Sequence, residues 1–190
     1  MKYWLLLITL FFTATAQAAN PVVKLETSEG DIVIELYQDK SPITVANFLA
    51  YVDAGFYTGT VFHRIIPNFM IQGGGFSADY KKKATKAPIQ NEADNGIKNA
   101  RGTIAMARTG EPHSATAQFF INTVNNSNLD HRSKDMRGWG YTAFGKVTKG
   151  MDVVDKISAT PTSGGSLDGY PARDVPVSPI IIKKATVVSR

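Results

Sequence analysis

FHRIIPNFMIQGG, which occupies residues 62–74, is the part of the sequence that predicts most about the fold. Its central Pro-Asn pair is typical of a turn and separates two runs of β-branched and aromatic residues, 61–66 and 69–72. This order predicts a strand, a turn and a second strand. Phe69 and Met70 are adjacent, so on one strand their side chains point to opposite faces. We therefore expect one of them to face outward or to lie in a bend, which favours a pocket on the surface.

The residues on the N-terminal side of this stretch predict a β-hairpin followed by a helix. Residues 22–27 and 31–37 are rich in β-branched residues and flank a short turn, as the two strands of a hairpin do. Ser41 and Pro42 then introduce a run with apolar residues at helical spacing, which ends at Gly55. We expect Ser41 to cap this helix and Pro42 to occupy its first position.

The residues on the C-terminal side predict further short strands and one short helix. Strands are expected at 103–107, 118–123, 141–147 and 180–188, and a helix at 151–157. The remaining segments, 76–99, 124–138 and 160–179, are polar or rich in Gly, Pro and Ser and are expected to be loops. Many short strands with two helices, and neither an internal repeat nor an interdomain linker, predict one mainly β domain built as a closed or nearly closed barrel. Closure would also remove exposed strand edges, which promote aggregation.

The N-terminus resembles a secretory signal peptide. Lys2 precedes an apolar run over residues 4–12, and Ala16-Gln17-Ala18 has the small-x-small pattern of a cleavage site. We expect residues 1–18 to be removed and 19–190 to form the mature domain. The apolar run is shorter than the ~20 residues that a membrane-spanning helix needs, so no membrane span is expected after cleavage. An uncleaved anchor or a buried N-terminal strand is the alternative.

Composition limits the possible functions. The 190 residues fit one domain and contain no cysteine, which excludes disulfides, thiolate catalysis and zinc–thiolate sites. The formal net charge of +5 is compatible with nucleic-acid binding. However, the basic residues are scattered apart from Lys81 to Lys83 and Lys86, which favours a solvated basic loop and no nucleic-acid partner.

Motifs for several common enzyme classes are missing from the sequence. The three histidines, His63, His113 and His131, lack the zinc-protease spacing, and Gly164 to Asp168 lacks the second glycine of a nucleophile elbow. The three glycines at 73–75 are a weak phosphate-loop candidate, because no Gly-Lys-Ser/Thr follows them. A serine hydrolase with dispersed Ser, His and Asp is not excluded, although nothing favours it. We expect neither a metal nor a cofactor.

The stretch at residues 62–74 closely resembles the signature of the cyclophilin family of peptidyl-prolyl cis-trans isomerases, and the resemblance extends over about 22–188. Later blocks of the family are matched, in the same order, by residues 102–107, 114–122 and 144–147. Residues 91–93 and 138–141 resemble the bacterial branch. The resemblance implies a closed eight-stranded antiparallel β-barrel capped by two α-helices, with its active face on the outside of the barrel.

The resemblance implies that Arg64 is the catalytic residue. Isomerisation breaks no covalent bond, and its barrier of ~18–20 kcal/mol is the loss of amide resonance as the C–N bond rotates. A catalyst must therefore stabilise the twisted amide more than either planar form. In the twisted state the proline nitrogen regains a lone pair, which a fixed cationic donor such as a guanidinium stabilises. A surface ion pair is the alternative role for Arg64.

The resemblance also implies an apolar seat for the proline ring. Phe69, Met70 and Phe120 match the residues of the family's pocket, and Leu129 lies beside them in this reading. Tyr141 stands roughly where relatives often carry His, and it keeps an aromatic wall with a hydroxyl group.

Five further residues are expected to contact the substrate. Gln72 matches the residue that binds the substrate backbone and steadies the arginine, and Gln118 matches a second polar contact. Ala107 and Arg108 match the backbone that pairs with an extended peptide, where a small Ala107 leaves room for the residue before proline. His63 precedes the arginine as in many relatives and is expected to support substrate binding.

We expect a monomeric isomerase of the periplasm that acts on proline-containing peptides and unfolded exported proteins. Asn128 stands where many eukaryotic relatives carry a Trp that helps to bind cyclosporin, so weak cyclosporin binding is expected. One alternative is a peptide-binding or chaperone module with little catalysis. Another, which rests only on the net charge, is a basic nucleic-acid or surface binder.

Overall fold

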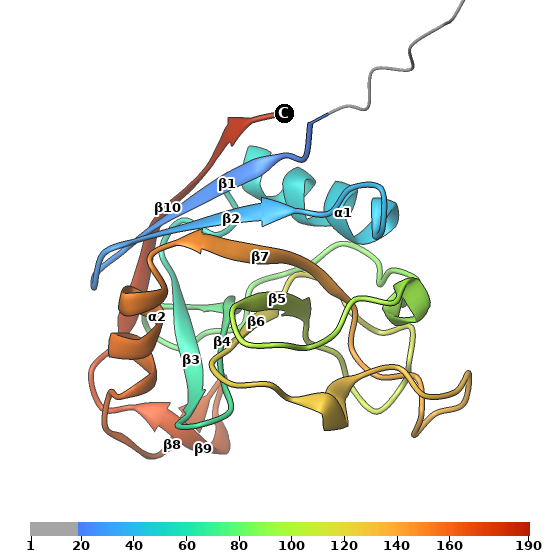
Figure 1. Ribbon diagram of the computed structural model, residues 1–190. Coiled ribbons are helices and arrows are strands. Elements are labelled where there is room, and N and C mark those ends of the chain that lie inside the picture. The colour runs from blue at the N-terminus through green and yellow to red at the C-terminus, as the bar shows by residue number, and fades with distance from the viewer. Residues whose placement is uncertain (1–18) are drawn as a thin grey trace, which may run out of the picture.

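The computed structural model describes residues 19–190, and the predicted signal peptide, residues 1–18, lies outside the described residues. Eight antiparallel strands form a closed barrel in the order β1-β10-β3-β4-β6-β5-β7-β2 (Figure 1). The barrel strands are β1 (Val22–Thr27), β2 (Asp31–Leu36), β3 (Thr60–Ile66), β4 (Met70–Ser77), β5 (Thr103–Met106), β6 (Phe119–Asn122), β7 (Ala143–Lys149) and β10 (Ile180–Ser189). Two α-helices accompany them, α1 (Pro42–Asp53) and α2 (Met151–Ser158). The predicted fold class, a closed eight-stranded barrel with two helices, is confirmed.

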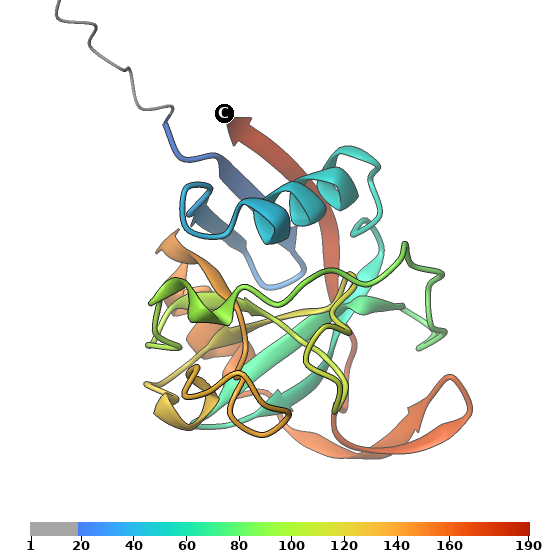
Figure 2. The same ribbon diagram turned by 90° about the vertical axis from the view of Figure 1, so that its right-hand side faces the viewer.

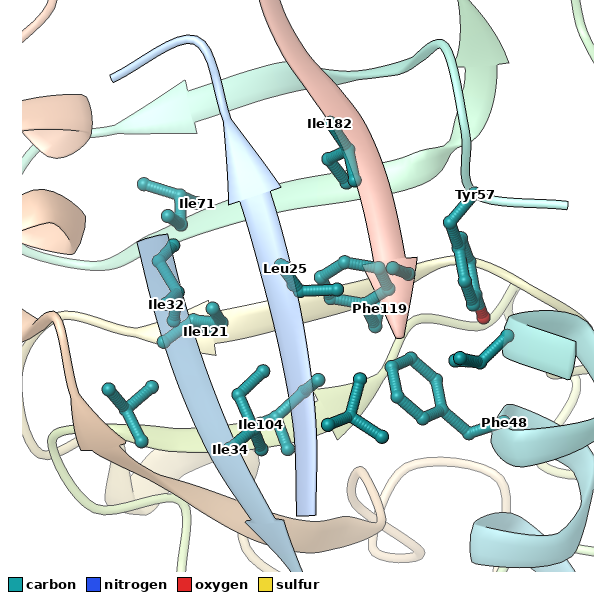
Figure 3. Close-up of a cluster of buried hydrophobic side chains, with 14 of the residues drawn as sticks. Leu25, Ile32, Ile34, Phe48, Tyr57, Ile71, Ile104, Phe119, Ile121 and Ile182 are labelled. Carbon is teal, nitrogen blue, oxygen red and sulfur yellow. The ribbon is translucent and has the colours of Figure 1, made fainter. Parts of the chain in front are cut away.

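The barrel encloses the main hydrophobic core. Along β2, Ile32, Ile34 and Leu36 are fully buried while the residues between them are partly exposed, as expected for a strand with one buried face. Phe48 of α1 reaches the same core and packs edge-to-face on Phe119, with ring centroids 5.7 Å apart (Figure 3). Because side chains fill the barrel interior and α1 covers one of its ends, a peptide must bind elsewhere on the molecule.

The N-terminus of α1 is capped from a distant loop. Pro42 begins the helix and Ser41 occupies the N-cap position, as predicted, but the Ser41 side chain makes no capping hydrogen bond. The Ser41 hydroxyl instead donates to the carbonyl of Ala143, at 3.3 Å. The Glu92 carboxylate accepts hydrogen bonds from the backbone N–H groups of Ile43 and Thr44, at 3.1 and 2.8 Å. These donors are among those that a helix leaves free at its start.

The segment 160–179, predicted to be a loop, contains a second sheet. Strands β8 (Thr162–Leu167) and β9 (Tyr170–Pro176) pair as an antiparallel hairpin outside the barrel (orange in Figure 2). Its turn residues, Asp168 and Gly169, have φ values of 53° and 86°. Two successive residues with positive φ are the geometry that Asp-Gly pairs favour in two-residue hairpin turns. The Gly- and Ser-rich composition of residues 160–179 led to the prediction of a loop. The Asp168-Gly169 pair is the one local feature of the segment that indicates a hairpin.

Smaller differences concern the other predicted loops and one strand boundary. The polar segments 76–99 and 124–138 each hold one turn of 3-10 helix, η1 (Ala93–Asn95) and η2 (Ser127–Leu129). Strand β7 begins at Ala143, so Tyr141 precedes the strand in which we placed it. Neither α-helix found within residues 19–190 has the length and hydropathy of a membrane span.

Candidate active site

A second apolar cluster lies on the outer face of the barrel, over β4, β5 and β6. Ile71, Ile104 and Ile121 point into the main core, so their neighbours in sequence point outward. Met70, Ala105, Phe120 and Ala143 form the buried part of this outer cluster. Partly buried residues around it include Phe69, Leu129 and Tyr141. The outer cluster provides the apolar floor of a pocket.

The pocket on this cluster brings most of the predicted site residues together. It is lined by Arg64, Phe69, Met70, Gln72, Ala107, Arg108, Phe120, Leu129 and Tyr141. Met70 begins β4 and Phe69 belongs to the preceding turn, so both reach the outer face although they are adjacent. This agrees with the expectation that one of the two lies in a bend.

One wall of the pocket is aromatic and is stiffened by a cation. The rings of Phe120 and Tyr141 meet nearly edge to face, with centroids 5.7 Å apart. The Arg108 guanidinium lies over the Tyr141 ring, 4.6 Å from its centroid, which is the geometry of a cation–π contact. Its Nε donates to the carbonyl of Gly140 at 2.9 Å, and Nη1 donates to the carbonyl of Thr109 at 2.9 Å. Arg108 is therefore fastened to the wall, which leaves Arg64 as the other cation that lines the pocket.

A β-bulge turns Arg64 towards this pocket. In the pairing of β3 with β4, Phe62 lies opposite Gly73 and Arg64 lies opposite Gln72, so His63 is an extra residue. Regular alternation would place Phe62 and Arg64 on the same face. The bulge breaks the alternation, so Phe62 enters the core while the Arg64 side chain is 42% exposed and lines the pocket.

The Arg64 guanidinium forms one ion pair within the described residues. Its Nε lies 3.6 Å from Oδ2 of Asp174, on β9 of the outer hairpin. Both side chains are more than a third exposed, so water screens the pair, and it contributes little to stability. We find no hydrogen bond from the Arg64 side chain to any other group within residues 19–190, which leaves its donors available to a ligand. Asp174 was not predicted, and no local pattern in the sequence pointed to it.

The two predicted glutamines form one polar edge of the pocket. Gln72 Nε2 donates to Oε1 of Gln118 at 3.0 Å. Gln118 does not line the apolar pocket; it lines an adjoining hollow that also includes Gln72, Ala107 and Lys82. Gln72, Ala107 and Arg108 line both hollows, so the two adjoin as one groove. The Gln72 amide thus donates to Gln118, and the expected contact between Gln72 and Arg64 stays a prediction.

The structure does not place His63 on the groove. Its side chain is buried beside the Phe76 ring, with ring centroids 4.6 Å apart. Burial lowers the pKa of the imidazole to about 4, with the nearby Arg64 charge acting in the same direction. Its Nδ1 has no hydrogen-bond partner within the described part of the chain. A direct contact between His63 and a peptide is therefore not supported, because the bulge that exposes Arg64 buries His63.

The described residues hold no cluster of three or more His, Cys, Asp or Glu side chains that would suit a metal ion. The groove instead combines an apolar seat, an aromatic wall, an amide edge and one half-exposed guanidinium. Such a site can bind an apolar ring and stabilise a lone pair next to it.

Comparison with known proteins identifies the family. The family model described as cyclophilin type peptidyl-prolyl cis-trans isomerase/CLD matches residues 22–187. A peptidyl-prolyl cis-trans isomerase of Streptomyces antibioticus is 57% identical over 166 residues, which are 87% of this chain and 98% of that protein. Peptidyl-prolyl cis-trans isomerase A of Dickeya dadantii is 51% identical over 183 residues, which are 96% of this chain and 93% of that protein.

A solved structure agrees with these sequence matches. A Cryptosporidium parvum cyclophilin type peptidyl-prolyl cis-trans isomerase, crystallised in the presence of the dipeptide Ala-Pro, superposes with a TM-score of 0.71 at 27% identity. The match covers 89% of this chain and 99% of that one. The sequence and structure matches both extend over most of the barrel, and this chain therefore belongs to the cyclophilin family and is a peptidyl-prolyl cis-trans isomerase.

Proposed function

We propose that the outer groove is where the X-Pro bond rotates and that Arg64 is its catalytic residue. The observation that carries this proposal is the placement of a half-exposed guanidinium at the edge of the apolar pocket formed by Met70 and Phe120. An apolar ring seated in that pocket has its nitrogen at the rim, within reach of a long cationic side chain.

The proposed mechanism is electrostatic. Phe69, Met70, Phe120 and Leu129 hold the proline ring while the carbonyl on the other side of the C–N bond turns. As resonance is lost, the proline nitrogen becomes pyramidal, and the Arg64 guanidinium donates a hydrogen bond to its lone pair. Since this interaction exists only in the twisted state, it lowers the barrier without tightening the binding of either planar isomer. The mechanism involves no covalent intermediate.

The polar edge is proposed to bind the rest of the peptide. Gln72 and Gln118 offer amide groups beside the pocket, and Ala107 leaves space for the residue before proline. Arg108 and Tyr141 would act as the rigid wall against which the peptide lies. Rigid groups bind a peptide with less loss of side-chain freedom than mobile ones.

A proline-tetrapeptide isomerisation assay on wild type and Arg64→Ala tests the proposal. Loss of one preorganised donor to transition-state charge typically lowers turnover by ~10²–10³-fold, and we expect a loss on this scale. Arg101→Ala is the control, because Arg101 is also exposed and ion-paired, to Asp155, at a place outside the groove. High turnover that is unchanged in Arg64→Ala would exclude Arg64 as the catalytic residue. An inactive wild type that still binds the peptide would favour the alternative function, a peptide-binding or chaperone module.

We further propose that the enzyme is exported to the periplasm, acts there as a monomer and assists the folding of exported proteins. The basic start, apolar run and Ala16-Gln17-Ala18 pattern support export. Expression with the native leader, followed by mass measurement of the periplasmic protein, tests this. A mature chain that begins at Ala19 is the expected result, and full-length protein retained in the cytoplasm would contradict it.

Weak binding of cyclosporin is proposed for the same groove. Asn128, in η2, is exposed beside the pocket residue Leu129, and a short amide offers less apolar surface than an indole ring. An inhibition titration measures the affinity. Stoichiometric inhibition at the enzyme concentration used would contradict weak binding.

A further inference from the structure

The β8–β9 hairpin is attached to the barrel beside the catalytic groove. It lies outside the closed barrel, and β9 packs against β3, the strand that carries Arg64 (Figures 1 and 2). Val175 of β9 is buried, and the Tyr80 hydroxyl donates to the carbonyl of Pro176 at 3.3 Å. These contacts hold the part of β9 next to Arg64 in a defined place.

A β-bulge in β9 directs Asp174 away from the regular ladder. Ser163 pairs with Val175 and Gly165 pairs with Ala172, so β9 has two residues where β8 has only Gly164. Asp174, one of those two residues, has a φ of 59°. Asp adopts this left-handed conformation more readily than most residues, although the conformation is still uncommon. Bulges occur next to active sites, where they re-aim a side chain, and here the re-aimed carboxylate meets the Arg64 guanidinium.

We propose that Asp174 is a positioning residue that holds Arg64 in its catalytic orientation, an inference that rests on the proposed function of Arg64. The Asp174 carboxylate lies 3.6 Å from Arg64 Nε, so the two terminal nitrogens of the guanidinium remain for the substrate. An arginine has many rotamers, and an exposed one must be ordered before it can donate to the proline nitrogen. A fixed carboxylate on one edge of the guanidinium favours one orientation in advance, which lowers the entropic part of the barrier.

Asp174→Asn is the variant that tests this role. Asn keeps the shape of the side chain and tolerates positive φ, so the hairpin is expected to fold while the negative charge is lost. Measured couplings of exposed ion pairs predict that kcat/KM falls by about two- to fivefold, mainly through kcat. The matched control is Asp168→Asn, because Asp168 also has positive φ and belongs to the same hairpin, but lies in its turn. We expect wild-type kcat/KM for the control.

A double-mutant cycle separates positioning from a general structural effect. If Asp174 acts through Arg64, Asp174→Asn has no further effect on the residual activity of Arg64→Ala. High salt weakens exposed charge pairs, so it should also shrink the difference between wild type and Asp174→Asn. A change in the Nε–H resonance of Arg64 in Asp174→Asn would show directly that the guanidinium has lost its neighbour.

The possible outcomes distinguish this inference from the proposed function. If Arg64→Ala retains full activity, the proposed role of Arg64 fails and the role of Asp174 fails with it. If Arg64→Ala is impaired while Asp174→Asn matches the wild type, only the positioning role is wrong. Positioning through Arg64 is also contradicted if Asp174→Asn lowers kcat/KM by the same factor in the wild type and in Arg64→Ala. The same holds if the control Asp168→Asn lowers kcat/KM as much as Asp174→Asn does.

Discussion

Arg64 and His63 are adjacent in sequence, but the Arg64 side chain is half exposed and the His63 side chain is buried. The bulge in β3 leaves Arg64 half exposed at the groove and encloses His63 beside Phe76. A guanidinium tolerates this position because it stays charged and in contact with water. An imidazole without water is held neutral, which explains why burial lowers its pKa.

The lowered pKa of His63 predicts a pH-dependent stability. The unfolded imidazole takes up a proton near pH 6.5, whereas the folded one does so only near pH 4. The unfolded state therefore binds more protons between these values, and the free energy of unfolding decreases as the pH falls from about 6.5 to 4. A difference of this size in pKa corresponds to about 3 kcal/mol.

Urea unfolding of wild type and His63→Gln at several pH values checks this prediction. Gln does not titrate, so we expect the variant to lose less stability than the wild type between pH 7 and pH 4.5. Parallel pH profiles for the two proteins would show that His63 is not the group responsible.

The start of α1 shows how one element depends on another that is distant in sequence. The Glu92 carboxylate accepts from two backbone N–H groups at this helix end and also from the hydroxyl of Thr44, at 2.7 Å. A negative charge at this end is also favoured by the helix dipole. The helix whose Phe48 packs in the core is thus fixed by the loop that follows β4.

Removal of this cap is predicted to destabilise the protein. Glu92→Ala should lower the free energy of unfolding by about 1–2 kcal/mol, because it leaves helix donors without an acceptor. The free energy of unfolding of Glu92→Gln, which keeps one acceptor oxygen, should lie between those of the wild type and Glu92→Ala. Glu111→Ala is the control, since Glu111 is exposed in a loop. Chemical denaturation measures all four proteins, and equal stability of Glu92→Ala and the control would contradict the capping role.

Among the elements, those with regular patterns could be predicted from the sequence, and those defined by local exceptions could not. The β-branched runs of β1 and β2 and the helical spacing in α1 and α2 led to correct predictions. The β8–β9 hairpin was missed because its strands contain Gly, Ser and Pro and its first strand is mostly exposed, so no apolar alternation marks them. Only the Asp-Gly pair in the turn carried a hairpin signal.

At the scale of the whole molecule, closure of the barrel depends on a short pairing. Strand β10 pairs with β3 only through Ile180, Ile181 and Ile182, and it pairs with β1 over the rest of its length. Ile182 lies at the change of partner, opposite Thr60 on one side and Thr27 on the other. Its side chain is fully buried in the main core (Figure 3).

Ile182→Ala is predicted to destabilise the barrel without changing the groove. Loss of a fully buried Ile side chain typically costs about 2–5 kcal/mol, through lost burial and a residual cavity. Val188→Ala, on the same strand but 60% exposed, should cost less than about 0.5 kcal/mol. Urea unfolding gives both values, and kcat/KM measured where Ile182→Ala is still folded should equal that of the wild type. Equal destabilisation by the two substitutions would show that the closing strand is not held by this core contact.

The candidate site could be predicted only in part. Resemblance to the family pointed to the nine residues that line the pocket, and alternation explains why Met70, Gln72 and Phe120 share the outer face. The burial of His63, the contact of Arg64 with Asp174 and the cap from Glu92 were not foreseen. The first two depend on which strands pair and in what register, and the third depends on where the loop after β4 meets α1.

The mainly β class, the main barrel strands and both helices could be predicted from the amino-acid sequence, because hydrophobic periodicity is a local property of neighbouring residues. The direction of the Arg64 side chain and the charge that it meets depend instead on how distant strands pair. A single extra residue in β3 reverses the face of the next side chain, and the bulge in β9 brings Asp174 to it from a distant part of the chain. Such features arise from the pairing of separate strands, so no short stretch of sequence contains them.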